Sequence, residues 1–388
     1  MDFSTSDVHG EIRSAVAALC KGFPDAYWRS VDHARAYPEE FVGALTAAGW
    51  LAILVPERFG GAGLGITEAG IVLEEINAAG GNAAVAHAQM YTMGALVRHG
   101  RPDQQEEYLR AIARGDLRLQ AFAVTEPDAG SDTTRIRTFA RRDGDAYVVD
   151  GQKIFISRTM HSDLMLLLAR TTPYDELDDK SRGLSLFLVD LREAQASGQL
   201  AVRAIETMLN HHTTEVVMNA LRLPATSLVG TEGEGFRHVL ESWNAERTLV
   251  ASEAIGDGHW FVRRASEYAT GRIVFGRPIG ANQAVQHPIA QGYAQVIAAA
   301  LVRDKAAWLY DSGQKCGAEA NMAKLLASQA SWATANACLD AYGGYGFATE
   351  YDVERKFRET RLLLTAPISN SLILNFLGHN VLGMPRSY

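Results

Sequence analysis

The sequence has 388 residues, of which 47% are hydrophobic and 21% are charged, and its formal net charge is −8. A chain of this size can bury a large core and is expected to form two or three packed units. The acidic balance excludes a general nucleic-acid-binding surface, because such a surface needs a basic field along the phosphates. No apolar run reaches the roughly 18 residues that span a bilayer, and the first residues lack the order of a secretory signal, so we expect a cytoplasmic location.

The first part of the chain, from Val8 to about Leu119, has a helical pattern. Apolar residues recur at spacings of three and four in EEFVGALTAAGWLAILV and EAGIVLEEINAAGGNAAVAHAQMYTMGALV. Loops are predicted at PERFGGAGLG and HGRPDQ. The glycines of RFGGAGLG are interpreted as a connection, because the Lys-Ser or Lys-Thr of a phosphate loop does not follow them.

The middle part, from about residue 120 to 230, has a β pattern. The runs AFAVTE, AYVVDGQKIFI, LMLLLART, LSLFLVD and LAVRAIE are separated by turn residues such as RRDGDA and predict a small sheet or barrel. Two segments are dense in groups that bind ligands, AFAVTEPDAGSD and DGQKIFIS. Phe155 and Ser157 take alternating positions of one strand and are therefore expected on one face. Taken singly, these segments also fit a plain turn and core packing.

After TEGEGF the helical period returns and holds almost to the end, with breaks at GRIVFGRPIG and AYGGYGFATE. Helices, then strands, then helices predict an α+β architecture with a β domain between two helical domains. The cysteines Cys20, Cys316 and Cys338 form no CxxC pair, and His211 and His212 would point to opposite faces of a strand. We therefore expect neither a disulfide framework nor a metal site.

The helix predicted after Gly235 carries a carboxylate on its apolar face. Glu246 falls three residues after Trp243 and four before Val250. The rest of that stripe is Phe236, Val239, Leu240 and Ala254. A Glu in this position is costly unless a partner or a function compensates, and burial would raise its pKa towards the range of a useful base. An ion pair with Arg247, or a helix face rotated from the expected one, is the structural alternative.

Four stretches taken together resemble the acyl-CoA dehydrogenase family, flavoproteins that desaturate acyl-CoA thioesters between Cα and Cβ. They are TEPDAGSD, DGQKIFIS, FGRPIG with the following glutamines, and GGYGF with the following EY, ER and R. The resemblance covers nearly the whole chain. It implies an N-terminal helical domain (1–120), a middle β domain (121–230) and a C-terminal four-helix bundle (231–388). It also implies bound FAD, an acyl-CoA substrate, an electron-transferring flavoprotein as acceptor, a homotetramer and a role in fatty-acid β-oxidation.

The resemblance assigns residues to the flavin ring. Phe122, Val124 and Thr125 would line its pyrimidine side. Phe155 matches a position where many members carry Trp against the ring face. Ser157 matches a position where many carry Thr, which bonds near flavin N5.

The outer parts of the cofactor are assigned in the same way. Arg272, Phe275 and Gln283 match residues that reach the FAD of a neighbouring subunit. Gly343 and Gly344 match the contact with the pyrophosphate. The sequence departs from the family pattern three residues earlier, where Asp340 stands in place of a frequent Gln.

The usual catalytic base of the family is missing. It is often a Glu in a Tyr-Glu-Gly-Thr segment shortly after the Arg that Arg358 matches. This chain has Ala366-Pro367-Ile368-Ser369 there, and the sequence contains no acidic residue after Glu359. Pro367 also lacks the main-chain N–H that helps to hold the thioester carbonyl in members with the usual base.

Isovaleryl-type and long-chain-type members carry the base on the helix that here follows Gly235, in a Glu-Arg pair ten residues before a Gly. Glu246 and Arg247 precede Gly256 by that interval, so the resemblance selects Glu246 over its rival Glu253. The substrate would be bound by Ser131, Trp243, Asn244 and Arg247.

Two alternatives stay open. One is a flavoenzyme on the same scaffold with different chemistry, such as a reductase, a desulfinase or an oxidase. The other is a non-catalytic subunit that stabilises an active homologue. The length and branching of the acyl chain are not determined, although Gln89 and Trp243 are large enough to limit the depth of a pocket.

Overall fold

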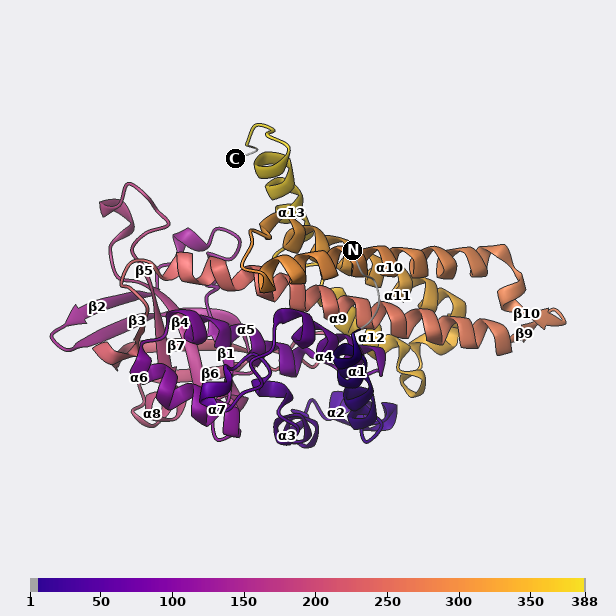
Figure 1. Cartoon of the computed structure of the whole chain (residues 1–388), viewed down its shortest axis with the longest axis horizontal. Helices are drawn as coiled ribbons and strands as arrows, with labels where there is room; N and C mark the ends of the chain where they lie inside the picture. The colour runs from indigo at the N-terminus through magenta and orange to yellow at the C-terminus, as the bar shows by residue number, and fades with distance from the viewer. Residues whose placement is uncertain (1–5, 387–388) are drawn as a thin grey trace. The chain divides into compact units, whose positions relative to one another are not determined.

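The computed structural model describes residues 6–386 of the chain. They form two compact units. The helical unit comprises the described residues within 1–44, 64–87 and 244–388, and the sheet unit comprises 45–63 and 88–243. The predicted α+β architecture, with helical segments before and after a β segment, is confirmed (Figure 1). The boundaries 1–120, 121–230 and 231–388 stay a prediction.

The N-terminal helices follow the predicted period. At the first of them, the Ser6 side chain accepts a hydrogen bond from His9 N at 3.2 Å and so caps the helix. The helices are α1 (Asp7–Cys20), α2 (Asp25–His33), α3 (Glu39–Ala47), α4 (Ile66–Ala78), α5 (Ala84–His99), α6 (Pro102–Gln104) and α7 (Arg110–Arg114). Among residues 6–386, no helix has the length and apolar character needed to cross a membrane.

The sheet contains the five predicted strands and three others. The strands are β1 (Leu119–Ala123), β2 (Phe139–Asp143), β3 (Ala146–Ser157), β4 (Leu164–Arg170), β5 (Leu184–Asp190), β6 (Leu200–Ala204), β7 (Thr213–Pro224) and β8 (Leu228–Val229), and α8 (Leu191–Ala196) follows β5. Their order is β6-β7-β3-β2-β4-β5-β8, and β1 pairs in parallel with β4. Every residue of β4 is buried, and its side chains from Leu164 to Ala169 enter apolar clusters on both faces.

The sequence prediction missed β2, β7 and β8. In β7 the alternation of apolar and polar residues fails at Asn219-Ala220. Ala220 has a φ of +48°, and the pairing of β7 with β3 shifts register between Val149 and Gly151, opposite that point. A β-bulge of this kind removes the period of two on which the sequence prediction depends.

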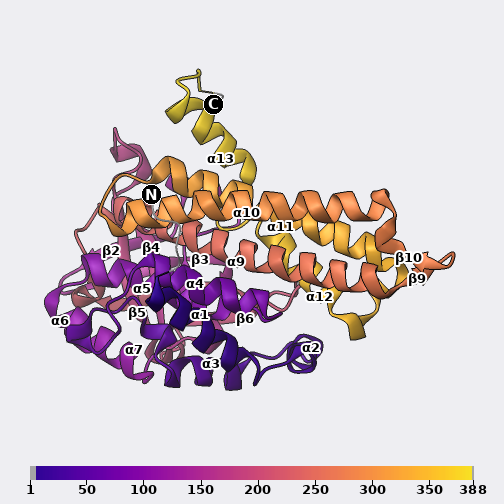
Figure 2. The same ribbon diagram turned by 45° about the vertical axis from the view of Figure 1, so that its right-hand side comes forward.

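The C-terminal helices form the predicted bundle. They are α9 (Gly235–Gly271), α10 (Gln283–Asp311), α11 (Gly317–Tyr342), α12 (Val353–Leu362) and α13 (Asn370–Phe376), and the hairpin β9 (Ile273–Val274) and β10 (Arg277–Pro278) joins α9 to α10. In both views α9, α10 and α11 run alongside one another (Figure 2). The apolar stripe predicted on α9 is buried at Val239, Val250 and Ala254, but its member Leu240 is 41% exposed. Including Leu240 in the stripe was wrong. It lies about 100° around the helix from Val239, which places it at the edge of the buried face.

Close packing of α4 against α9 depends on a glycine. A Cβ atom added at Gly256 would lie 2.3 Å from the main-chain oxygen of Glu74 and 2.8 Å from Cβ of Asn77. Main-chain atoms cannot turn away as a flexible side chain can. Gly256 therefore lets the two helices approach closely.

We expect Gly256→Ala to destabilise the protein by about 2–3 kcal/mol, because the overpacking outweighs the gain of about 1 kcal/mol in helix propensity. Urea denaturation at fixed protein concentration measures the effect. The matched control is Gly10→Ala in α1, where a Cβ would meet nothing within 4 Å and a small stabilisation is expected. Equal effects of the two substitutions would contradict the packing argument.

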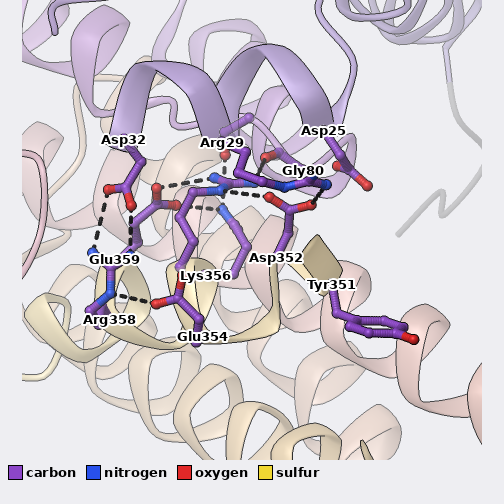
Figure 3. A network of polar contacts seen from close by, with 12 residues as sticks. Asp25, Arg29, Asp32, Gly80, Tyr351, Asp352, Glu354, Lys356, Arg358 and Glu359 are labelled. Carbon is purple, nitrogen blue, oxygen red and sulfur yellow. Dashed lines mark hydrogen bonds and ion pairs between the residues drawn. The ribbon is translucent and has the colours of Figure 1, made fainter. Parts of the chain in front are cut away.

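A partly buried charged network ties α2 and α12 together within the helical unit (Figure 3). Arg29 Nη2 lies 2.6 Å from Asp352 Oδ2, and Arg358 Nη2 lies 2.6 Å from Asp32 Oδ2. Arg355 is buried and donates from Nη2 to the main-chain oxygen of Gly80 at 2.9 Å. The network therefore joins elements that are far apart in the sequence.

Lys356 extends the network to α9. Its side chain is buried, and its Nζ lies 2.5 Å from Asp257 Oδ1 and 3.2 Å from Glu359 Oε2. The same nitrogen donates to the main-chain oxygen of Gly81 at 2.8 Å. Burial raises the pKa of Asp257 to about 6, although Lys356 opposes that shift. Burying the Asp257 carboxylate is therefore unfavourable in free energy, and its ion pair with Lys356 offsets part of that penalty.

Candidate active site

The loop that follows β1 is held by a buried ion pair. Lys153, on β3, donates from Nζ to Glu126 Oε1 at 2.9 Å and to the main-chain oxygen of Val124 at 2.8 Å. Ile154 N donates to the main-chain oxygen of Thr125 at 2.9 Å. These bonds fix Val124 and Thr125 beside the strand that carries Phe155 and Ser157. Sequence analysis did not identify Glu126 and Lys153 as the supports of this loop.

Phe155 and Ser157 point away from the core of the sheet unit. Ile156, between them, is 2% exposed, whereas Phe155 is 61% exposed and Ser157 is half-buried. Phe155 also has a φ of +58°, a left-handed conformation that costs a bulky residue about 1–3 kcal/mol and is concentrated at ligand sites. An exposed, strained aromatic side chain fits a surface that a ligand covers.

The other predicted residues of the sheet unit lie near this segment or on its surface. Phe122 and Val124 are half-buried, and the Phe122 ring centroid lies 6.1 Å from that of Tyr91. Ser131 is exposed. Trp243 is half-buried and packs edge-on against Phe236, with ring centroids 5.9 Å apart.

The structure brings two predicted cofactor segments of the helical unit together. The Arg272 guanidinium lies 5.6 Å from the centroid of the Tyr345 ring, next to the glycine pair. Gly343 ends α11 with a φ of +58°, and a Cβ at Gly343 or Gly344 would meet nothing within 4 Å. Gln283 begins α10 and is exposed.

Phe275 lies between β9 and β10 and is fully exposed. The β9–β10 hairpin itself projects beyond the ends of α9 and α10 (Figures 1 and 2). The φ of Phe275 is +49°, and that of Gly276 is +79°. Two such residues in a two-residue loop are typical of a type I′ turn, which favours Asn-Gly. An aromatic residue at the first position adds strain and gains no packing within the described chain.

These features fit FAD, the cofactor that the resemblance implies. The main chain at Gly343 and Gly344 is open on the side where a Cβ would project, which allows the close approach that a pyrophosphate needs. Phe155 and Phe275 offer exposed aromatic faces to a flat ring. Internal packing explains neither the open glycine Gly344 nor the two strained aromatic residues.

Glu246 is buried in the helical unit, with 7% of its surface exposed. Burial raises its pKa to about 7, although His87 and Arg247 oppose the shift, and Glu253 adds to it. Within residues 6–386, no hydrogen bond to the Glu246 carboxylate is found. A desolvated carboxyl with this pKa is suited to accept a proton near neutral pH.

The side chains around Glu246 include both predicted and unpredicted residues. Arg247 is buried and donates from Nη1 to Asn244 Oδ1 at 3.1 Å. The charge of Arg247 lowers the pKa of Glu246, but the effect of burial is larger. His87, from α5, lies 2.7 Å from Glu253 through its Nδ1 and was not predicted.

Lys324 holds the segment from which the usual base is missing. Its buried Nζ donates to the main-chain oxygen of Ile368 at 2.7 Å and to Asn370 Oδ1 at 2.8 Å. Burial and the charge of Arg247 lower its pKa to about 7. A Lys within the apolar run MAKLLAS was a sequence signal for a buried cation that the sequence analysis did not use.

We expect Glu246→Gln to stabilise the protein at pH 8. The folded pKa of Glu246 is raised, so its contribution to stability is present below the unfolded pKa and is lost as pH rises through about 7. Above that pH the buried charge costs about 3 kcal/mol, which the neutral amide avoids. The gain should shrink to below about 1 kcal/mol at pH 5.

Urea denaturation of both proteins at pH 5 and pH 8 measures this difference. The control is Glu267→Gln, an exposed position on the same helix, where no pH-dependent gain is expected. A Glu246→Gln variant that is less stable than the native protein at pH 8 would mean that the carboxylate has a stabilising partner.

Family models, related sequences and solved structures agree with the resemblance that the sequence shows. The acyl-CoA dehydrogenase N-terminal, middle and C-terminal domain families match residues 6–116, 121–221 and 233–366. The acyl-CoA dehydrogenase fadE12 of Mycobacterium bovis is 35% identical over 100% of this chain and 99% of its own length. The 3-(aryl)acrylate reductase of Clostridium sporogenes is 32% identical over 86% of this chain and 87% of its own. The solved glutaryl-CoA dehydrogenase in complex with glutaryl-CoA aligns with a TM-score of 0.92 and 27% identity over 100% of this chain and 98% of that one.

Proposed function

The chain belongs to the acyl-CoA dehydrogenase family, and on that premise we propose that it desaturates an acyl-CoA thioester between Cα and Cβ with Glu246 as the base. Members of the family are FAD-dependent oxidoreductases, and FAD is the cofactor of this chain. Acyl-CoA oxidoreduction is the family's chemistry. The direction of the reaction, the substrate and the electron acceptor belong to the proposal.

The observation that supports the proposal best is the buried carboxyl of Glu246, with its raised pKa, on the predicted face of α9. Glu246 takes the α-proton of the substrate onto its carboxylate, and exclusion of water strengthens its basicity. Residues such as Phe155, Ser157 and Gly343 would hold FAD, which would supply the acceptor for the β-hydride. Lys324 holds the segment around Ile368. The main-chain N–H of Ile368 would donate to the thioester carbonyl in place of the N–H that Pro367 lacks.

The remaining assignments follow the family. The flavin contacts are Phe122, Val124, Thr125, Phe155 and Ser157, and the outer cofactor contacts are Arg272, Phe275, Gln283, Gly343 and Gly344. The substrate contacts are Ser131, Trp243, Asn244 and Arg247. A homotetramer, in which the exposed tip at Phe275 reaches the cofactor of a neighbouring subunit, accounts for the strain at that residue. An electron-transferring flavoprotein is the proposed acceptor, and a cytoplasmic location is the proposed setting.

Anaerobic titration of the purified yellow protein with a panel of saturated acyl-CoA thioesters tests the proposal. One or more of them should bleach the flavin absorbance and yield one enoyl-CoA per flavin, detected by mass spectrometry. Free CoA and the corresponding enoyl-CoA are controls that should leave the flavin oxidised. A protein purified without flavin, and unable to take up FAD, would favour the non-catalytic subunit instead.

A reductase is the second candidate, because a relative that is 32% identical bears the name 3-(aryl)acrylate reductase. In such an enzyme, flavin that has been reduced by light would be reoxidised by an α,β-unsaturated compound. The corresponding saturated compound would fail to reduce the flavin. The same panel, run in both directions, therefore separates the two functions. Reduction by a saturated acyl-CoA with release of the enoyl product would decide for the dehydrogenase.

A further inference from the structure

Lys324 is a fully buried residue of α11 whose side chain bonds outside its own helix. Its Nζ donates to the main-chain oxygen of Ile368 at 2.7 Å and to Asn370 Oδ1 at 2.8 Å. Among residues 6–386, no carboxylate lies within ion-pair distance of this nitrogen. A buried amine is costly unless its bonds compensate, so the two acceptors indicate what the lysine does.

Both acceptors belong to the loop between α12 and α13, and this loop is closed on itself. Asn370 N donates to the main-chain oxygen of Leu364 at 3.2 Å. Asn370 Nδ2 donates to Ser328 Oγ at 3.1 Å, one turn after Lys324 on α11. These bonds hold the two ends of the loop, while the bond from Lys324 holds its middle at Ile368.

The main-chain N–H of Ile368 has no acceptor within residues 6–386. The oxygen of the same residue is taken by Lys324, and the preceding residue, Pro367, has no N–H. Ile368 is half-buried. Half-buried donors that the protein leaves unpaired bond to water or to a ligand. The loop therefore presents a main-chain donor that a ligand carbonyl can use.

The loop and Glu246 belong to one packed region of the helical unit. A single apolar cluster contains Val250 and Ala254 of α9, Ala323 and Ala327 of α11, and Leu363 at the start of the loop. Glu246 lies one turn before Val250, and Lys324 directly follows Ala323. In an acyl-CoA the α-carbon is bonded to the carbonyl carbon, so the base and the carbonyl donor must approach neighbouring atoms.

We propose that Lys324 is a positioning residue that fixes the Ile368 N–H for the thioester carbonyl and so stabilises the enolate formed when the α-proton leaves. This inference rests on the proposed function. The bond between the α-carbon and its hydrogen breaks, and the proton passes to the Glu246 carboxylate. Negative charge builds on the carbonyl oxygen, to which the Ile368 N–H donates.

Lys324 itself exchanges no proton or electron in this step. An ammonium group has three N–H donors, and a neutral amine still has two. Both bonds to the loop therefore persist in either protonation state of Lys324. Its effect on the reaction comes from the position of the loop and not from a change of charge.

The rate of flavin reduction gives the first test. K324M keeps the length of the side chain but removes both donors. With an acyl-CoA that reduces the native flavin, the rate constant of reduction should fall about 10- to 100-fold, because a misplaced donor loses most of its effect in the transition state. The Kd of the same acyl-CoA should change less than about threefold, since the bond matters least in the ground state.

Infrared spectroscopy of a bound ligand measures the carbonyl hydrogen bond without turnover. The probes are 3-thia analogues of the acyl-CoA panel, labelled with ¹³C at the carbonyl. Sulfur in place of Cβ leaves no hydride to transfer. In the native protein the carbonyl band should lie at a lower frequency than in an apolar solvent, and in K324M it should move to a higher frequency.

The matched control is K356M, which removes another fully buried lysine of the helical unit. Lys356 bonds to the main-chain oxygen of Gly81 and to Asp257, and not to the loop. K356M should lose stability but leave the carbonyl band unmoved, which separates positioning from a general loss of stability. If K324M does not fold, K324Q serves, because its shorter side chain does not reach Ile368.

The outcomes are separable. An unmoved carbonyl band in K324M would overturn the inference, whatever the rate. A band that moves equally in K324M and K356M would reduce Lys324 to a structural residue and overturn it as well. If no acyl-CoA reduces the flavin, the proposed function fails, and the band of the bound analogue still decides the role of Lys324. If no analogue binds at all, both proposals fail.

Discussion

Glu246→Gln is expected to abolish turnover while FAD stays bound. The amide keeps the size and shape of the side chain but cannot accept the α-proton, and a positioned general base contributes about 10²–10⁴-fold to a rate. We expect kcat to fall by about that factor. Stopped-flow reduction of the flavin by a saturated acyl-CoA measures the step directly. The flavin spectrum and the FAD content should match those of the native protein.

Glu253→Gln is the matched control, because it removes another buried carboxylate from the same helix. The two positions are seven residues and therefore about 10 Å apart along the axis, so only one of them can meet the α-carbon. We expect flavin reduction in Glu253→Gln to stay within about tenfold of the native rate. If Glu246→Gln reduced its flavin at close to the native rate and Glu253→Gln did not, the base would be Glu253.

The helices could be predicted because their apolar residues repeat within a single element. The buried face of α9, with Val239, Val250 and Glu246, follows from the period of 3.6 residues. The failure at Leu240 has the same origin, since a stripe on a long helix has edges that the pattern does not define. In the sheet unit, β4 was recognised as a continuous apolar run. β7 was missed because the bulge at Ala220 breaks its alternation.

The surroundings of Glu246 could not be predicted, because they depend on contacts between distant elements. His87 and Glu253 are remote in the sequence, and neither period nor spacing relates an imidazole on α5 to a carboxylate on α9. The same holds for Lys324, which supports the segment around Ile368 from another helix. Local pattern identified the acid, while only the three-dimensional structure identified what surrounds it.

Backbone conformation is a further property that the sequence did not reveal. Phe155 and Phe275 were assigned to the cofactor by resemblance, but their left-handed main chain is visible only in the structure. Strain at two exposed aromatic residues is independent physical support for a ligand at both, because folding alone gains nothing from it.

The second large effect is expected at Lys356, where Lys356→Met should destabilise the protein by about 3–5 kcal/mol, the usual cost of leaving one member of a buried ion pair alone. The substitution keeps most of the side-chain volume, so the loss reports the charge left on Asp257. Burial raises the pKa of Asp257 in the folded protein to about 6, so the contribution of Asp257 to stability falls as pH rises through about 6. The variant should therefore lose most stability at pH 8 and least at pH 5. Urea denaturation at both pH values gives the two numbers.

Two further variants separate charge from packing at this position. Lys305→Met removes a lysine whose Nζ lies 3.1 Å from Glu319 Oε1 but which is 62% exposed, so its loss should stay below about 1 kcal/mol. Combining Lys356→Met with Asp257→Asn should recover much of the stability, because the uncompensated charge is then gone. If the double variant were as unstable as Lys356→Met alone, the bond from Lys356 to the Gly81 main chain would be the main source of the effect.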